Sequence, residues 1–312
     1  LMKAADLPLQ VACVTMVGIN SAFSFMFPGS PTIGNIIASQ AFGTTMYSGA
    51  AIGVVMCVIQ VALVLLYVEF FLVRKYRKAG IGYKPSPTEA GMRADAANLT
   101  EDQMPSFIEA IIPLIVVVAG CPILQFAFGF ASTPATVIAQ TAAIIVCLLL
   151  NIKRGFHKRL ASTITNGCVQ CSVPLLSVCA IVGYSTLISN TAFFSAAMEK
   201  IGNLNISPYV MVVIGTALFA ALSADSMGGI SGAVGTVGAR AIAAGANAGL
   251  VHRLTLAAAT TFDSMPFSSM LNVTMGFLGL SHKDVYKQIA VVQIGATSIA
   301  TLIGMLIAMV IG

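Results

Sequence analysis

Two short stretches of the chain place polar side chains and prolines inside otherwise apolar sequence. Residues 260–276 read TTFDSMPFSSMLNVTMG, and residues 27–35 read FPGSPTIGN. In lipid every backbone N–H and C=O needs a partner, so prolines among polar residues indicate a helix that stops and restarts against protein or water. We therefore expect two broken transmembrane helices. Paired interrupted spans in two parts of one chain are typical of a transporter that binds its solute near mid-membrane.

The polar groups of both interruptions could bind a solute, including an anion. An anion that leaves water must be paired or hydrogen-bonded, and neither interruption contains an arginine or a lysine. Helix N-termini can replace such a cation, because their free N–H groups and positive dipole ends hold anions. The alternative is that the prolines and serines only kink packed helices. On the binding interpretation, the solute is hydrogen-bonded by Ser30, Thr32, Asn35, Ser264, Ser268, Ser269 and Asn272.

A Gly/Ser-rich stretch lies between the two interruptions. Residues 223–235 read SADSMGGISGAVG; a short apolar arm precedes them and a Gly/Ala-rich arm follows. A short arm, a polar tip and a small-residue return predict a re-entrant hairpin over about residues 208–250. We expect its tip to close over the solute with Ser226, Gly228, Gly229 and Ser231.

Two acids are expected deep among small residues: Asp225 at the hairpin tip and Asp263 in the second interruption. Intramembrane acids are costly and usually functional, and burial favours the protonated form of a carboxyl. We expect Asp263, and less strongly Asp225, to couple a proton to the solute. The alternative is a helix cap or a partner for Arg240 or Arg253. Sodium coordination by unwound carbonyls also stays open.

Other charged and sulfur-containing residues point to no catalytic, cofactor or metal chemistry. Arg240, His252 and Arg253 could attract anions, but Arg253 is better explained as a snorkelling anchor at a helix end. The pair Cys168 and Cys171 has no second pair or histidine cluster beside it, so we expect no metal or redox site.

Composition indicates an integral membrane protein. Hydrophobic residues make up 57% of the 312 residues, charged residues only 9%, and the mean hydropathy is +0.92. The net charge is +5, but the basic residues gather in short loops beside apolar spans, as the positive-inside rule expects. Nucleic acid is therefore excluded as a partner.

The spans predict an all-α polytopic fold with an inverted repeat. Residues 1–74 hold the end of the first repeat, 75–104 a cytoplasmic linker, and 105–312 the second repeat with a broken helix at about 252–280. Pro28, Asn35, Phe42-Gly43 and Tyr47 align weakly with Pro266, Asn272, Leu278-Gly279 and Tyr286. The hairpin of the first repeat is expected upstream of the chain's first residue.

Five motifs carry a family resemblance: FPGSPTIGNII, FGTT, MGGISGAVG, AGANAGLVHRLTLAAATTFDSMP and GLSHKDVYKQI. In order and spacing they resemble the gluconate:proton symporter (gluconate permease) family of the ion transporter superfamily, closest to its hydroxybutyrate-permease-like branch. The resemblance implies a hairpin and a broken helix in each of two inverted repeats. The chain departs from the family at Phe267 and Ser268, where relatives usually carry histidine or asparagine.

The resemblance implies proton-coupled symport of a small hydroxy-carboxylate, such as gluconate or hydroxybutyrate, and we expect a multi-pass protein of the bacterial inner membrane. The expected partners are the organic anion, a proton or sodium ion, and the bilayer, with a homodimer left open. An intramembrane enzyme is the first alternative, but no HExxH, GxSxG or GxGD motif is present. An anion channel is the second, although opposed breaks suit alternating access better.

Overall fold

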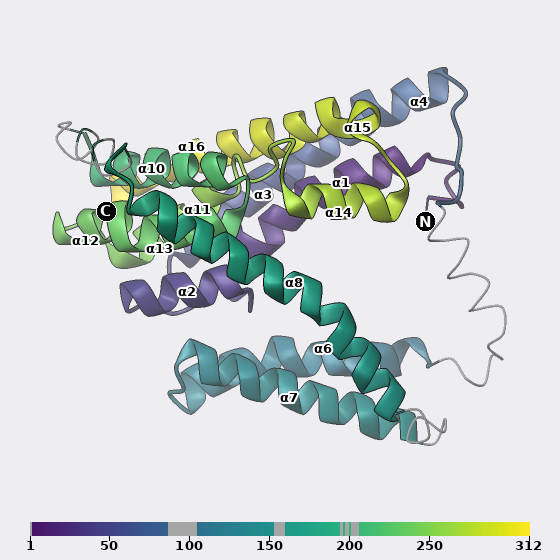
Figure 1. Cartoon of the computed structure of the whole chain (residues 1–312), viewed down its shortest axis with the longest axis horizontal. Helices are drawn as coiled ribbons and strands as arrows, with labels where there is room; N and C mark the ends of the chain where they lie inside the picture. The colour runs from purple at the N-terminus through teal and green to yellow at the C-terminus, as the bar shows by residue number, and fades with distance from the viewer. Residues whose placement is uncertain (1, 87–104, 153–159, 194–195, 197–199, 201–205) are drawn as a thin grey trace. The chain divides into compact units, whose positions relative to one another are not determined.

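The structure, a computed structural model, describes residues 2–86, 105–152, 160–193, 196, 200 and 206–312, and within these residues it is helical with no strand. In this described part of the chain, five helical rods are long and apolar enough to cross a membrane; Figure 1 shows their arrangement within each unit. The protein is therefore a helical membrane protein. The five rods are Leu9–Met26, Ala50–Lys78, Phe107–Ala127, Ser132–Asn151 and His282–Ile311, and a shorter apolar helix is Pro208–Ser223.

The chain divides into two compact units, Leu1–Ala90 with Ala180–Gly312 and Gly91–Cys179. This division follows packing and cuts the chain elsewhere than the predicted repeat boundaries at residues 74 and 104. Of the predicted linker, the first part is helical to Lys78, and residues 87–104 lie outside the described part of the chain.

The smaller unit is built on a helical hairpin. Helix α6 (Phe107–Pro122) continues as the π-helical segment η4 (Ile123–Ala127), α7 (Ser132–Asn151) packs against α6, and α8 (Leu160–Ser189) begins in this unit. A capping box starts α6, because the Ser106 hydroxyl accepts from the Glu109 N–H while the Glu109 carboxylate accepts from the Ser106 N–H. Gly129, at φ +70°, makes the turn between the two helices.

The larger unit opens with a broken helix. Helix α1 and its π-helical continuation η1 stop before the proline-rich stretch; a short helix, α2, follows it, and the long rod α3 comes next. The bounds are α1 Leu9–Ser21, η1 Ala22–Met26, α2 Ile33–Phe42, α3 Ala50–Tyr67, η2 Val68–Val73 and α4 Arg74–Lys78.

The same unit then contains a helical hairpin, a second broken helix and a last rod. Figure 1 shows α10, α11 and α13 packed side by side. The bounds are α10 Pro208–Ser223, α11 Ser226–Ala233, η7 Val234–Gly238, α12 Ala239–Ala243, α13 Ala248–Ala259, α14 Ser269–Leu278, α15 His282–Ile289, η8 Ala290–Gly295 and α16 Ala296–Ile311.

Two clusters of buried apolar side chains form the core of the larger unit. One joins α10, α11 and α13 to α2 and the first half of α3. The other joins α1, η2, α4, α14 and α15. Along α3, Cys57 belongs to the first cluster and Val64 to the second, and the fully buried polar residue Gln60 lies between them. A polar layer therefore lies between the two cores.

Candidate functional site

The first interruption runs from Phe27 to Thr32 and is tied to the loop that follows α2. The chain leaves η1 at Phe27 in an extended conformation, and Gly29 has a left-handed φ of +84°. The Gly29 N–H donates to the Met46 carbonyl at 2.9 Å. The Thr32 hydroxyl turns back and donates to the Ser24 carbonyl at 3.1 Å. The interruption is thus an ordered turn rather than a kink in a continuous helix.

A buried arginine from α13 holds this turn. Arg253 is 0% exposed, and its guanidinium uses all five N–H donors on backbone carbonyls. Two of the acceptors, Phe25 and Phe27, are at the end of η1; the others, Met46 and Ser48, follow α2, and the distances are 2.7–3.4 Å. Carbonyls at a helix C-terminus lack partners within the helix and carry its negative pole. Arg253 therefore satisfies and neutralises that pole.

This arrangement corrects two sequence expectations. Arg253 is not a snorkelling anchor, because its side chain is buried in protein. The first interruption also has a cation beside it, although none lies within its own sequence. The cation comes from a helix more than 200 residues away in the chain, which local sequence does not reveal.

His252 and Asn35 form a second tie between α13 and α2. The Asn35 amide donates to the carbonyls of Ser30 (2.7 Å) and Met46 (3.4 Å). Its Oδ1 can only accept, so the hydrogen in the 2.7 Å contact with His252 belongs to the imidazole Nε2. His252 Nδ1 contacts the Thr44 hydroxyl at 2.6 Å. Asn35 and His252 are both fully buried, so their polar atoms serve the turn.

The tip of the α10/α11 hairpin is a sharp turn closed by an acid. Ala224 has a left-handed φ of +50°, which is strained for a residue with a Cβ atom. The next residue, Asp225, is the N-cap of α11, because its Oδ1 accepts from the Met227 and Gly228 N–H groups at 2.7 and 3.2 Å. The helix-cap alternative for Asp225 is thus the one the structure contains.

The start of α11 contacts both broken helices. A Cβ atom at Gly34, near the start of α2, would lie 2.5 Å from Ile230 of α11. A Cβ atom at Gly229 would lie 3.2 Å from the Cβ of Ala259, the last residue of α13. At Gly229 the neighbours are the short side chains of Ala220 and Ala259, so glycine is required there, whereas at Gly34 the Ile230 side chain could move aside. The hairpin tip thereby touches the restart of the first helix and the stop of the second.

The second interruption runs from Thr260 to Ser268 and centres on Asp263. Its carboxylate Oδ1 accepts from the Ser264 hydroxyl at 3.0 Å and from Gln293 Nε2 of η8 at 3.1 Å. The same Gln293 amide donates to the Thr260 carbonyl at 2.9 Å. Asp225 lies near enough for its charge to act on Asp263. The interruption therefore presents a carboxyl whose hydrogen-bond donors are neutral groups.

The restart of the second helix is organised by Asn272 and His282. Asn272 is exposed, and its amide donates to the carbonyls of Ser268 (2.8 Å) and Pro266 (3.4 Å). His282 Nε2 donates to the Pro266 carbonyl at 2.8 Å. Ser268 is buried before the first turn of α14, and the side chain of Ser269 lies outside the described part of the structure.

The predicted residues of the hairpin also lie at this junction. Ser226, Gly228 and Gly229 are buried in the first turn of α11. Ser231 has a buried hydroxyl without a hydrogen-bond partner among the described residues. Thr32 and Asn35 of the first interruption use their polar atoms on protein, whereas Ser30 and Asp263 are half-buried.

Sequence reasoning missed three buried polar residues: Ser21 on α1, Gln60 on α3 and Gln293 on η8. Gln60 Nε2 donates to the Ser21 hydroxyl and to the Gly18 carbonyl, and the Ser21 hydroxyl lies 3.2 Å from Gln293 Oε1. Through Gln293 this chain of hydrogen bonds reaches Asp263. The available signal was a lone amide or hydroxyl side chain inside an apolar span, since such groups are costly in lipid and usually functional.

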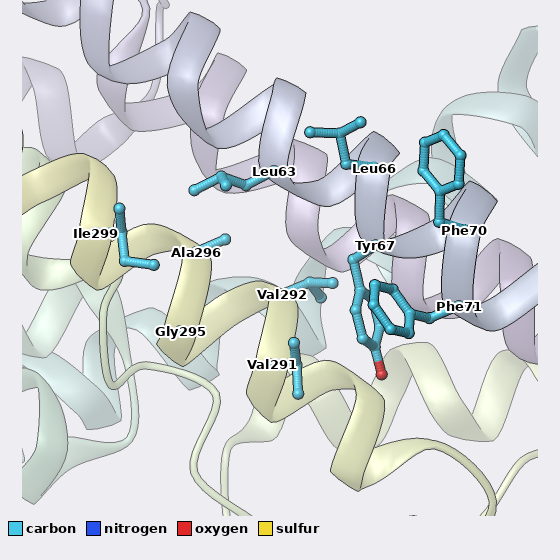
Figure 2. A pocket seen from close by; sticks show the side chains of 10 residues that line it. All are labelled: Leu63, Leu66, Tyr67, Phe70, Phe71, Val291, Val292, Gly295, Ala296 and Ile299. Atoms are coloured by element: carbon cyan, nitrogen blue, oxygen red, sulfur yellow. The ribbon is translucent and has the colours of Figure 1, made fainter.

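A separate groove lies between α3 with η2 and η8 with α16 (Figure 2). Its volume is about 580 Å³, and apart from the Tyr67 hydroxyl its wall is apolar, with Leu63, Phe70, Val291 and Ile299 among the lining residues. It contains none of the predicted site residues. An apolar groove on membrane-crossing rods is unsuited to an anion, so the candidate site remains the junction of the two interruptions.

Comparison with known protein families, with curated proteins and with solved structures finds no match for the chain.

Proposed function

We propose that this protein is a secondary active transporter that carries a small hydroxy-carboxylate together with a proton across the bacterial inner membrane. The observation that carries the proposal is the meeting of two interrupted helices at one hairpin tip. At the first interruption, the buried cation Arg253 contacts the C-terminal end of η1. The second has a carboxyl. An anion and a proton would bind at these two places.

The anion half of the proposal follows from the electrostatics of the first interruption. Arg253 neutralises the negative end of η1, so the positive N-terminus of α2 dominates the gap. Free N–H groups there and at α14 would bind the solute carboxylate, as anions bind at helix N-termini. We assign Thr32 and Asn35 to positioning because their polar atoms already have protein partners. Gly228, Gly229, Ser264 and Asn272 are assigned to positioning for the same reason. Solute contact is assigned to Ser30, Ser226, Ser231, Ser268 and Ser269.

The proton half follows from Asp263. Its carboxylate receives hydrogen bonds from a hydroxyl and an amide, which tolerate either protonation state better than a fixed cation would. Asp225 adds a second negative charge nearby. When Asp263 binds a proton, its own negative charge is removed, so the occupied site carries only the charge of the solute carboxylate. The free-energy cost of holding that charge inside the membrane is then lower. Asp263 is therefore the proposed coupling residue, and Asp225 both caps α11 and supports it.

The similarity of α2 and α14, the helices that follow the two interruptions, supports an inverted repeat. Helices α2 and α14 each have ten residues and end at a glycine in the left-handed conformation, Gly43 and Gly279. Each carries an asparagine, Asn35 or Asn272, whose amide donates back into its own interruption. This agreement also supports the proposed kinship with gluconate:proton symporters.

Uptake into proteoliposomes tests the proposal. Purified protein is reconstituted, an inside-alkaline pH gradient is imposed, and radiolabelled gluconate, 3-hydroxybutyrate and lactate are offered in turn. We expect saturable accumulation of at least one hydroxy acid, abolished by a protonophore. Accumulation that follows a sodium gradient and ignores the protonophore would reassign the coupling ion. Solute flux that never exceeds equilibrium, with single-channel currents, would indicate a channel and contradict the proposal.

A further inference from the structure

Three buried polar atoms near the middle of the membrane-crossing rods have no hydrogen-bond partner among the described residues: Gln60 Oε1, Thr297 Oγ1 and Thr301 Oγ1. The three side chains are 0%, 0% and 1% exposed. An unpaired polar group in the interior loses its hydration without compensation. Native structures satisfy such groups with a protein partner or with ordered water.

Thr297 and Thr301, like Thr216 on α10 and Thr255 on α13, have a hydroxyl without a hydrogen-bond partner among the described residues. Other threonines in the helices are satisfied within their own helix. Thr15, Thr136, Thr141, Thr236 and Thr274 each donate to the carbonyl four residues earlier, at 2.6–2.9 Å. That bond within the helix is the usual way to satisfy a hydroxyl in an apolar environment. Thr297 and Thr301 do not make it, so their hydroxyls are available to another partner.

The unpaired atoms share one interface. Gln293, Thr297 and Thr301 recur every four residues on η8 and α16, so they form a stripe along one face about 12 Å long. Helix α3 packs antiparallel against this face. A Cβ atom at Gly304 would contact Met56, and Ile299 lines the groove with Leu63, so Gln60 lies at the level of the stripe.

The stripe begins at the proposed coupling residue. Gln293 donates to Asp263 at 3.1 Å and contacts the Ser21 hydroxyl through its Oε1 at 3.2 Å. The Ser21 hydroxyl in turn accepts a hydrogen bond from Gln60 Nε2, and the Oε1 of the same Gln60 side chain is one of the three unpaired atoms. A continuous series of polar groups therefore leads from Asp263 to the interface of α3 and α16.

We infer that this interface holds a file of internal water molecules that carries protons between Asp263 and the end of the stripe. Gln60 Oε1 and the hydroxyls of Thr297 and Thr301 hold the water, while the amide of Gln293 orients it toward the carboxylate. Each oxygen in the file accepts a proton from one side and releases one to the other. One proton is delivered to the Asp263 carboxylate, which becomes a neutral carboxylic acid. The inference rests on the proposed proton symport and adds the proton's route.

Valine variants test the file, because valine keeps the shape of threonine and has a methyl group in place of the hydroxyl. Thr297→Val, Thr301→Val and the double variant are compared with Thr136→Val, a buried threonine of the other unit whose hydroxyl bonds within its own helix. Two readouts are taken: pH-gradient-driven accumulation, and exchange of labelled for unlabelled solute at equal pH, which needs no net proton movement. We expect the double variant to slow accumulation at least about tenfold, as loss of a proton-transfer group does, and to keep exchange.

Unchanged accumulation in the double variant, with the wild type active, would overturn the route. The melting temperature of the double variant tests for bound water at the two hydroxyls, and this measurement does not depend on transport. Hydroxyls bonded to water lose those bonds on substitution, so the double variant should melt at a lower temperature. A melting temperature equal to or higher than that of the wild type would show that the hydroxyls are dry and unpaired, and would overturn the inference. A wild-type protein that does not accumulate solute would instead remove the proposed function.

Discussion

Two ionisable side chains at the interruptions show how this chain treats charge inside an apolar fold. Arg253 has every N–H donor on a backbone carbonyl, so it is a permanent part of the framework. Asp263 receives two hydrogen bonds from neutral groups and is half-buried, so it can change its protonation state without breaking the framework. We therefore treat the charge of Arg253 as structural and that of Asp263 as functional.

Arg253→Lys tests the structural charge. Lysine keeps the charge but has three N–H donors and no planar fork, so some of the carbonyls of Phe25, Phe27, Met46 and Ser48 lose their partner. We expect the free energy of unfolding to fall by about 3 to 5 kcal/mol, as when a buried charge loses its partners. Thermal unfolding in detergent measures this, with the exposed Arg240→Lys as control. A melting temperature equal to that of the control would show that the five bonds do not stabilise the turn.

Asp263→Asn tests the functional charge. Asparagine preserves size and hydrogen bonding but cannot bind and release a proton. We expect solute accumulation driven by a pH gradient to fall to the level of liposomes without protein, while solute exchange at equal pH continues. Both are measured in the same vesicle preparation. Continued accumulation by this variant would exclude Asp263 as the coupling group.

The hairpin and the two broken helices are the elements that build the site. The start of α11 is packed so tightly between α10 and α13 that a Cβ atom at Gly229 would lie 2.9 Å from the Cβ of Ala220 and 3.2 Å from that of Ala259. Both neighbours are short side chains that cannot rotate away. The position of the tip is thus determined by small residues on three helices.

Gly229→Ala tests this packing. The added methyl group must push α11 away from its neighbours, and overpacking of this kind costs about 1 to 3 kcal/mol. Gly235→Ala is the matched control in the same return arm, because a Cβ atom there meets open space and alanine favours a helix over glycine by about 0.5 to 1 kcal/mol. We expect Gly229→Ala to lower both the melting temperature and uptake, and Gly235→Ala to lower neither. Equal effects of the two substitutions would contradict the tight packing.

Local sequence predicted the elements better than it predicted their partners. The first interruption was expected at residues 27–35 and is non-helical over 27–32, since prolines and glycines act within their own segment. The second lies within the polar stretch 260–276: it is non-helical over 260–268, and the chain is helical again from Ser269. Arg253 and Gln60 could not be placed, because their partners lie on helices distant in sequence.

At the scale of the whole larger unit, a polar layer separates two apolar cores. Ser21, Gln60 and Gln293 lie between the cluster around the hairpin and the cluster around α14 and α15. The interruptions border this layer, since Asp263 is bonded to Gln293. A polar layer inside a membrane protein can hold a solute without contact with lipid.

Proton movement driven by the solute tests the central claim most directly. Vesicles containing the protein and an entrapped pH-sensitive dye start at equal internal and external pH, and an inward gradient of the transported hydroxy acid's salt is imposed with the membrane potential clamped. Symport predicts acidification of the vesicle interior that saturates with solute concentration and is absent with Asp263→Asn. Entry of the labelled solute without any change of internal pH, or the same acidification with Asp263→Asn, would contradict proton symport through this site.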